Sequence, residues 1–246
     1  MDPVIQSSIP FDISPRKLPG VQPTRMDEVF TRDDAFAGQM ALRDHLLATK
    51  RDAVLQMDES ARAAALEFLE LVLELAYPGS ERQTEVQRAD GVSIAVNRKD
   101  PLATIGQLIQ EDVCILQKSA DEHVMTGAVL CFPASWMLSE KFMRPLTGIH
   151  VPVDSYDASV AARVQRLFDG VQAGRPLWRF NALPYNDPTL HQPRSMHERR
   201  SDRHDDRSGY LRSERQTILR LPKSRAVVFC IHTYVVVREI HATVQD

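Results

Sequence analysis

Two histidines of this sequence lie in apolar surroundings where an imidazole could bind a metal ion. His150 belongs to the segment GIHVP at 148–152, just before a proline that restricts the backbone. A rigidly held neutral imidazole is a common ligand of iron and other transition metals, and the simpler alternative is a hydrogen-bonded core histidine. His232 lies in the apolar run 226–237, where a hydrogen-bonded histidine is the more ordinary interpretation because an unpaired buried charge is costly.

Polar residues recur along the stretch 211–221, which alternates like a strand. The alternation predicts that four of them share one face: Arg212, Glu214, Gln216 and Arg220. It places Arg215 on the opposite face, and in the next stretch it puts His232 and Tyr234 together. A strand face this polar between apolar neighbours could line a pocket. The alternative is an ion pair, for example with Glu214, that only supports the fold.

The cysteines exclude one class of metal site. Cys114, Cys131 and Cys230 are far apart and form no CxxC pair, so neither a zinc ribbon nor an iron–sulfur cluster is expected within the chain. Buried thiols in a reducing compartment are the simplest interpretation. The segment SMHERRSDRHDDRS at 195–208 is rich in His and Asp, but it has no compact ligand spacing and is expected to be a solvated loop.

Composition and charge indicate a soluble globular protein. The chain has 246 residues, of which 43% are hydrophobic and 26% charged, and its formal net charge is −3. This balance gives no electrostatic reason to expect a nucleic-acid partner. The N-terminus lacks the basic start and apolar stretch of a secretory signal, and no segment has the apolar length of a transmembrane helix. We therefore expect a cytoplasmic protein with no membrane contact.

The elements that must position these residues predict an α+β fold. Residues 1–80 are expected to form an N-terminal arm and a helical region, with helix-prone residues at 28–57 and a second helix that Asp58 caps and Pro78-Gly79 ends. Residues 81–246 are expected to form a mostly antiparallel sheet. Its predicted elements are a strand at 91–96, a helix at 101–117 running into a strand at 113–116, a strand at 124–132, a helix at 158–170 and a hairpin of 211–221 with 226–237.

Three segments carry a resemblance to a known family. They are VLCFPASWMLSEKFMRPLTGIHVPV at 129–153, RPLWRFNALPYNDPTLHQP at 175–193 and YLRSERQTILRLPKSRAVVFCIHTYVV at 210–236. Together they resemble the haem-dependent oxidative N-demethylases. The resemblance implies haem b bound in a PAS-like fold beside a helical region, and O2-dependent removal of a methyl group from a small secondary alkylamine such as dimethylamine, with release of formaldehyde. It also implies that separate reductase subunits, which carry flavin and an iron–sulfur cluster, supply the electrons.

The resemblance suggests roles for the residues already singled out. His150 would be the metal ligand, and the basic residues of the matched segments would pair with the haem propionates: Arg179, Arg212, Arg215 and Arg220. His232 and Tyr234 would line the cofactor pocket. Glu214 would relay protons or hold an ammonium substrate, and Asn181 would orient water or substrate. A thiolate of Cys131 is an alternative iron ligand, although LCFP at 130–133 does not resemble the ligand loop of cytochromes P450.

Two departures from the family pattern keep other functions open. Relatives commonly have Asn-Trp after the arginine of the middle segment, whereas here Phe180-Asn181 follows Arg179, and relatives usually continue beyond the final strand, whereas this sequence ends at Asp246. The alternatives are a non-catalytic haem-binding or gas-sensing PAS-like protein and a structural subunit that no longer binds the cofactor. Bound haem would separate the last alternative from the others.

Overall fold

The fold is built on one large antiparallel sheet that separates two groups of helices. The computed structural model describes residues 3–14, 20–150, 158–195, 197–198 and 208–238. Within them the strand order of the large sheet is β1-β7-β8-β9-β5-β6-β2, and β3 and β4 form a separate two-stranded sheet. The strands of the large sheet are β1 (Gln22–Pro23), β2 (Leu55–Met57), β5 (Asp112–Ser119), β6 (Glu122–Val129), β7 (Leu177–Tyr185), β8 (Tyr210–Arg220) and β9 (Val227–Val237).

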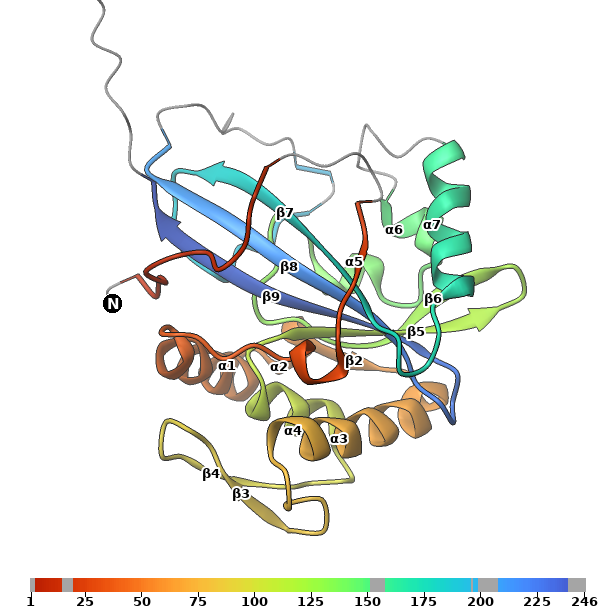
Figure 1. The fold of residues 1–246 in the computed structure, drawn as a ribbon, viewed down its shortest axis with the longest axis horizontal. Helices are drawn as coiled ribbons and strands as arrows, with labels where there is room; N and C mark the ends of the chain where they lie inside the picture. The colour runs from red at the N-terminus through yellow and green to blue at the C-terminus, as the bar shows by residue number, and fades with distance from the viewer. Residues whose placement is uncertain (1–2, 15–19, 151–157, 196, 199–207, 239–246) are drawn as a thin grey trace, which may run out of the picture.

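Helices cover the sheet on both sides (Figure 1). The first group consists of α1 (Phe36–Thr49), α2 (Arg51–Val54), α3 (Arg62–Ala76) and α4 (Pro101–Leu108), with the hairpin of β3 (Glu85–Gln87) and β4 (Ser93–Ala95) beside it. The second group consists of α5 (Leu138–Lys141), α6 (Leu146–His150) and α7 (Ala158–Gly170), all between β6 and β7 in the chain. Short 3-10 turns lie at Met26–Glu28 and Glu59–Ala61.

Side chains alternate along the strands and so form two separate hydrophobic cores. On one face, Val113 and Val228 pack with Phe68 and Leu69 of α3, and we call this the α3 face. On the other face, Cys114 and Val227 pack with Phe168 and Val171, which belong to or follow α7, and we call this the α7 face. By this alternation Val228 and Cys230 of β9 lie on the α3 face, and Val227 and Ile231 lie on the α7 face.

The hairpin of β8 and β9 is the longest pairing in the sheet. Its register is continuous from Tyr210 opposite Val237 to Arg220 opposite Val227. The connection includes Arg225 at a φ of 61°, a left-handed conformation that a turn residue adopts more readily than a strand residue. The predicted strands at 211–221 and 226–237 match these elements to within one residue at each end.

Local sequence explains the helical region as well. Asp58 accepts a hydrogen bond from the backbone N–H of Ser60 at 3.0 Å, so it caps the turn that leads into α3. In α3 the buried residues Ala65, Phe68, Leu69 and Val72 recur at helical spacing and face the sheet. In α1, Phe36, Met40 and Leu46 are buried in the same way.

The α+β class predicted from the sequence is confirmed, with differences in detail. The helix expected at 101–117 ends at Leu108, and β5 then runs over Asp112–Ser119. β7 was not among the predicted strands. The division at residue 80 stays a prediction, and strands from the first 80 residues pair with β7 and β6, so both regions contribute to one sheet. Among the described helices, none has both the length and the apolar character required to cross a bilayer.

Candidate functional site

A polar cluster on the α7 face brings together several of the residues singled out from the sequence. The register of β7 with β8 places Arg179 opposite Gln216 and Asn181 opposite Glu214. The amide of Asn181 donates to a Glu214 carboxylate oxygen at 3.0 Å, and the amide of Gln216 donates to the same oxygen at 3.1 Å. Arg179 donates to the side-chain oxygen of Gln216 at 3.1 Å. The four side chains thus form one connected network.

This network is shielded from water but not fully paired. The side chain of Glu214 is 12% exposed and Gln216 is 8% exposed. Buried polar atoms with no partner among the described residues include Nε of Arg179, Nε of Arg212 and Oγ1 of Thr233, which lies opposite Glu214 in the hairpin. Burial lowers the pKa of Arg179, and the charge of Glu214 opposes that shift. Because unpaired buried donors are costly, these atoms are suited to pair with a bound ligand.

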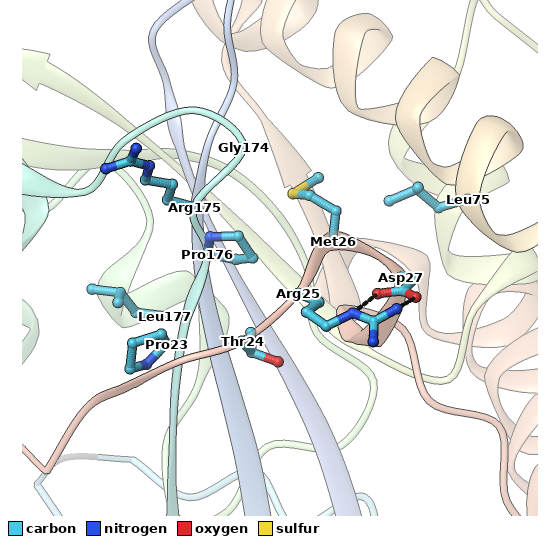
Figure 2. A pocket seen from close by; sticks show the side chains of 10 residues that line it. All are labelled: Pro23, Thr24, Arg25, Met26, Asp27, Leu75, Gly174, Arg175, Pro176 and Leu177. Carbon is cyan, nitrogen blue, oxygen red and sulfur yellow. Dashed lines mark hydrogen bonds and ion pairs between the residues drawn. The ribbon is translucent and has the colours of Figure 1, made fainter.

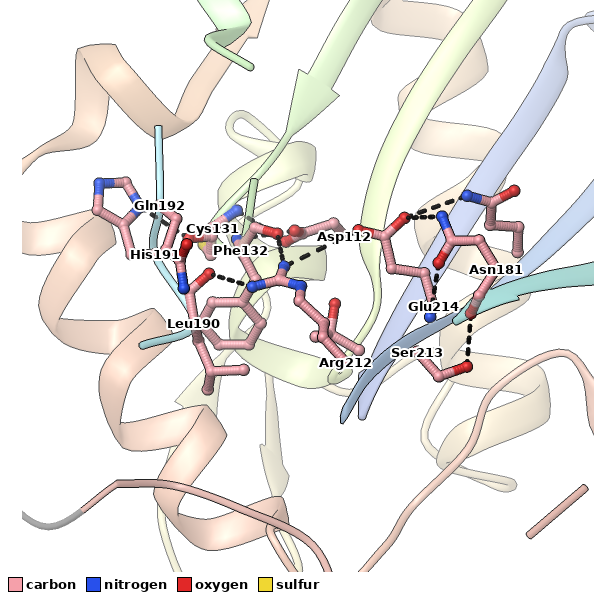
Figure 3. A network of polar contacts seen from close by, with 12 residues as sticks. Asp112, Cys131, Phe132, Asn181, Leu190, His191, Gln192, Arg212, Ser213 and Glu214 are labelled. Atoms are coloured by element: carbon pink, nitrogen blue, oxygen red, sulfur yellow. Dashed lines mark hydrogen bonds and ion pairs between the residues drawn. The ribbon is translucent and has the colours of Figure 1, made fainter. Parts of the chain in front are cut away.

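Arg212 connects this cluster to the segments that precede α5 and follow β7. Its guanidinium donates to the carbonyl oxygens of Leu190 at 3.1 Å and Phe132 at 2.7 Å, and it lies 3.9 Å from the Glu214 carboxylate. Figure 3 shows Arg212 between Asn181, Ser213 and Glu214 on one side and Phe132 and Leu190 on the other. Arg212 therefore fixes the backbone around the cluster, and its bonds to carbonyl groups leave only Nε unpaired.

A second buried network lies beside it and was not anticipated from the sequence. The Asp112 carboxylate accepts from Arg43 of α1 at 2.6 Å and from the backbone N–H groups of Cys131 and Phe132 at 2.7 and 2.8 Å. The Arg43 and Asp112 side chains are 0% and 1% exposed. This ion pair fixes the residues that follow β6, and those residues lead toward α5 on the α7 face.

Cys131 is a buried thiol of the core on the α3 side of the sheet. The residue is fully buried, and burial raises the pKa of its thiol to about 12. Its carbonyl oxygen lies 2.8 Å from Nδ1 of His191. The thiol is therefore protonated at neutral pH and packs as a small apolar side chain in the α3-side core.

Arg220 also lies on the α7 face, but it binds backbone carbonyl groups and has no contact with Glu214. Its guanidinium donates to the carbonyl oxygens of Val171 at 2.7 Å and Arg225 at 2.7 Å, and it also donates to the carbonyl of Phe168. These contacts join the end of α7 to the β8–β9 turn. The geometry is that of a structural arginine, and it leaves Arg220 engaged by the backbone.

His232 lies on the opposite, α3 face, between two carboxylates. Its Nδ1 is 3.1 Å from Glu111 and its Nε2 is 3.0 Å from Asp33, and the ring is 1% exposed. A neutral imidazole has only one N–H, whereas the protonated ring can donate to both carboxylates. Hydrogen bonds to Asp33 and Glu111 raise its pKa to about 9, against the opposing effect of burial. We call these three residues the histidine clasp.

The histidine clasp holds the N-terminal arm, residues 3–14, against the sheet. Gln6 donates to Asp33 at 2.8 Å, and its backbone pairs with Val235 of β9. Phe11 packs against three aromatic rings at centroid distances between 5.3 and 5.6 Å: Trp178, Phe180 and Tyr234. In Figure 1 the arm crosses in front of β7–β9. The structure therefore does not bring His232 and Tyr234 together with Arg179 and Glu214.

Arg215 also belongs to the arm side, as the strand alternation predicts. It pairs across the hairpin with His232, its guanidinium lies 5.2 Å from the Trp178 ring centroid, and it donates to Thr217 at 3.1 Å. Arg179 and Arg215 are thus near each other in the sheet but on opposite faces. This pair offers a matched comparison for any ligand that binds on one face only.

The proposed metal ligand His150 ends α6, and its side chain lies outside the described residues, as does most of the charged segment 195–208. Within the described part of the chain, no group of three His, Cys, Asp or Glu side chains could hold a metal ion. A haem iron needs only one protein donor, so this observation leaves the single-histidine prediction untested.

Sequence reasoning missed three residues near the cluster: Asp112, Lys141 and His191. Asp112 and Lys141 carry no local pattern, because the partners that matter are far away in the sequence. His191 stands inside the matched segment at 175–193, which was the available signal. Its Nδ1 is held by the Cys131 carbonyl, and burial lowers its pKa, so the ring is neutral and Nε2 is available as a donor to a metal.

A separate groove of about 630 Å³ opens between residues 23–27, α3 and the start of β7 (Figure 2). Its lining includes Arg25, Met26, Leu75 and Arg175, and Arg25 is paired with Asp27. None of the residues singled out from the sequence lines this groove. The groove therefore adds nothing to the polar cluster of the α7 face.

Comparison with known proteins identifies a family that matches nearly the whole chain. A family model described as haem-dependent oxidative N-demethylase, alpha subunit-like, matches residues 20–244. The matched range includes both helical groups, every strand of the large sheet and the polar cluster.

Proposed function

This chain belongs to the family of haem-dependent oxidative N-demethylase alpha-subunit-like proteins, and from that membership we propose that it binds haem on the α7 face and demethylates a small amine. The word "subunit" in the family description suggests a multi-subunit oxygenase. We further propose that the cofactor is haem b and that the substrate is a dimethylamine-like secondary amine. The electrons would come from a separate reductase that carries flavin and an iron–sulfur cluster.

The unpaired buried donors of the polar cluster are the observation that carries the proposal. Haem b bears two propionate carboxylates, and a carboxylate is the natural partner of a buried guanidinium. Arg179 offers its unpaired Nε on the α7 face, with Thr233 Oγ1 as a further unpaired donor. The residues present therefore fit the charged edge of the cofactor. The hydrophobic core of the same face, which includes Leu138 and Ile231, supplies apolar surroundings.

The chain's own groups would serve the reaction in distinct ways. Haem, when bound, supplies the activation of O2 that amino-acid side chains cannot provide. Glu214 is shielded and held by two amides, so it can keep a negative charge for an alkylammonium substrate or pass a proton into the site. Asn181 orients that carboxylate, because its amide donates to Glu214 while its oxygen accepts from the Glu214 backbone N–H at 3.1 Å.

The overall change balances with an external reductant. Dimethylamine, O2, two electrons and two protons give methylamine, formaldehyde and water. One oxygen atom enters the methyl C–H bond, and the resulting carbinolamine breaks its C–N bond to release formaldehyde. The electrons would come from the reductase, and protons would enter through groups such as Glu214.

We propose His150 as the iron ligand and retain His191 as the second candidate. His150 ends α6 on the side of the sheet that carries the polar cluster, whereas His191 has its Nδ1 fixed on the Cys131 carbonyl. The two assignments are separable, since the absorption spectrum of haem depends on its axial ligand. His232 is excluded from this choice because both of its ring nitrogens face carboxylates.

Two finer descriptions are also proposals. A PAS-like fold is supported by an antiparallel sheet whose one face is covered by helices inserted between β6 and β7. A cytoplasmic location is supported by three buried cysteines that form no disulfide with one another. Fractionation of the source cells would test the second description.

The proposal is tested by an absorption spectrum of the purified protein after haem reconstitution. We expect one haem per chain in the wild type, and a lost or shifted Soret band in His150→Ala but not in His191→Ala. The reverse pattern would transfer the ligand role to His191. A wild type that binds no haem would overturn the proposal and favour a structural subunit.

Turnover separates an oxygenase from a haem sensor. With an electron donor, the haem-loaded protein is expected to consume O2 in a dimethylamine-dependent manner and to release formaldehyde. We expect Glu214→Gln to lower kcat by about 10²–10⁴-fold, as is usual for loss of a group that transfers protons, while the Soret band stays unchanged. Equal turnover by this variant would remove Glu214 from the mechanism.

A further inference from the structure

Lys141 is a shielded cation on the same side of the sheet as the polar cluster. It is the last residue of α5, and its ammonium lies 4.4 Å from the ring centroid of Trp136, a residue that packs on the α7-face core. It forms no ion pair with any residue that the structure describes. A partly buried ammonium held only by an aromatic ring lacks the anion that would normally accompany it.

The groups around Lys141 place it at the edge of the cluster. Burial lowers the pKa of Lys141 to about 8, and three neighbours act in the opposite direction: Cys114 of β5, Glu214 of β8 and Glu140 of its own helix. Glu214 also acts on Arg179 from the other side. The charge of Glu214 thus acts on both Lys141 and Arg179, and Arg212 lies 3.9 Å from the same carboxylate.

This distribution leaves more positive than negative charge around Glu214. Glu140, the other acid near Lys141, accepts a hydrogen bond from Ser195 at 2.6 Å, so it is already engaged outside the cluster. Burying excess charge is unfavourable unless an opposite charge arrives with a ligand. A ligand with carboxylate groups would supply that charge.

We propose that the ammonium of Lys141 contacts a carboxylate of the bound cofactor, so that α5 and β7 hold its charged groups from two sides. The inference rests on the proposed function, and it adds a residue that neither the sequence motifs nor the family description assigns. Its role is to position the cofactor. The Trp136 ring would then hold the lysine stem in place for the contact.

The test measures the affinity of the apoprotein for haem and for haem dimethyl ester, in which both propionates are neutral. Lys141→Met is expected to weaken haem binding by roughly ten- to a hundredfold, the usual worth of a charge-assisted hydrogen bond, and Lys141→Arg should restore most of it. The ester should bind the wild type and Lys141→Met with equal affinity. Lys118→Met is the control, because Lys118 pairs with Asp169 in an exposed ion pair.

The outcomes distinguish this inference from the proposed function. If the wild type binds haem and Lys141→Met binds it equally well, the Lys141 contact is refuted while the haem site stands. If Lys141→Met weakens haem and its ester to the same extent, the lysine supports the fold and does not contact a carboxylate. A wild type that binds neither compound refutes the haem site itself.

Discussion

Replacing Asp112 by alanine is expected to lower the free energy of unfolding by about 3–5 kcal/mol, the usual cost of breaking a buried ion pair from one side. The change would leave the Arg43 guanidinium buried without its counter-charge and would orphan the backbone N–H groups of Cys131 and Phe132. Urea unfolding followed by far-UV circular dichroism would measure the loss. If Asp112→Ala proves too unstable to purify, Asp112→Asn can replace it, because the asparagine keeps one acceptor oxygen. Its free energy of unfolding should lie between those of the wild type and Asp112→Ala.

The matched control for this prediction is Asp100→Ala. Asp100 also pairs with an arginine, Arg51, at 2.7 Å, but the two side chains are 31% and 43% exposed. An exposed pair contributes about 0–1 kcal/mol, so this variant should unfold almost like the wild type. Similar losses for Asp112→Ala and Asp100→Ala would show that burial does not set the strength of the Arg43–Asp112 pair.

The second large effect is expected at the histidine clasp. His232→Gln should cost about 3 kcal/mol near pH 6, because it removes the cation between Asp33 and Glu111. The arm should also loosen, since Gln6 is held partly through Asp33. Hydrogen exchange of the backbone N–H of Gln6, which donates to the carbonyl oxygen of Val235, would report that loosening directly.

The clasp also predicts a pH dependence of stability. The folded pKa of His232 is raised to about 9, above its ordinary value of 6.5. Stabilisation by the protonated ring is therefore complete below pH 6.5 and is lost as the pH rises toward 9. The groups that face the ring are Asp33, Glu111, Tyr234 and Arg215. Hydrogen bonding to His232 lowers the pKa of Asp33 against the effect of burial, and burial raises the pKa of Tyr234 to about 12, so neither of these two groups titrates between pH 6.5 and 9.

Unfolding measured at pH 6, 7.5 and 9 would check this dependence. The difference in stability between wild type and His232→Gln should be largest at pH 6 and should shrink by pH 9. A difference that stays constant over this range would mean that the ring is not protonated in the folded protein.

The sequence predicted the elements whose patterns are local. The β8–β9 hairpin follows from strict alternation on both sides of a Pro-Lys-Ser-Arg turn, and α3 follows from apolar residues at helical spacing after the Asp58 cap. The same alternation correctly separated Arg215 from Arg212 and Arg220. Resemblance over the second half of the chain anticipated the family that matches residues 20–244.

The features that the sequence did not predict depend on contacts between residues far apart in the chain. β7 was missed because Arg179, Asn181 and Pro184 interrupt its apolar pattern, and its polar residues become strand-like only when they face those of β8. Asp112 finds its partner 69 residues earlier in the chain, a pairing that no local pattern reveals. His232 shares a strand face with Tyr234, which predicts a pocket-lining role, but its ring lies between Asp33 and Glu111, which come from two other segments.

The central claim, that the α7 face holds haem, is tested most directly by titrating haem into three apoproteins and following the Soret band. Arg179→Leu removes a buried guanidinium with an unpaired Nε from the α7 face, and Arg215→Leu removes a neighbouring guanidinium from the α3 face. We predict that Arg179→Leu weakens haem binding by at least about tenfold, whereas Arg215→Leu binds like the wild type. Weakening by Arg215→Leu alone, or equal binding by all three proteins, would contradict a haem site on this face.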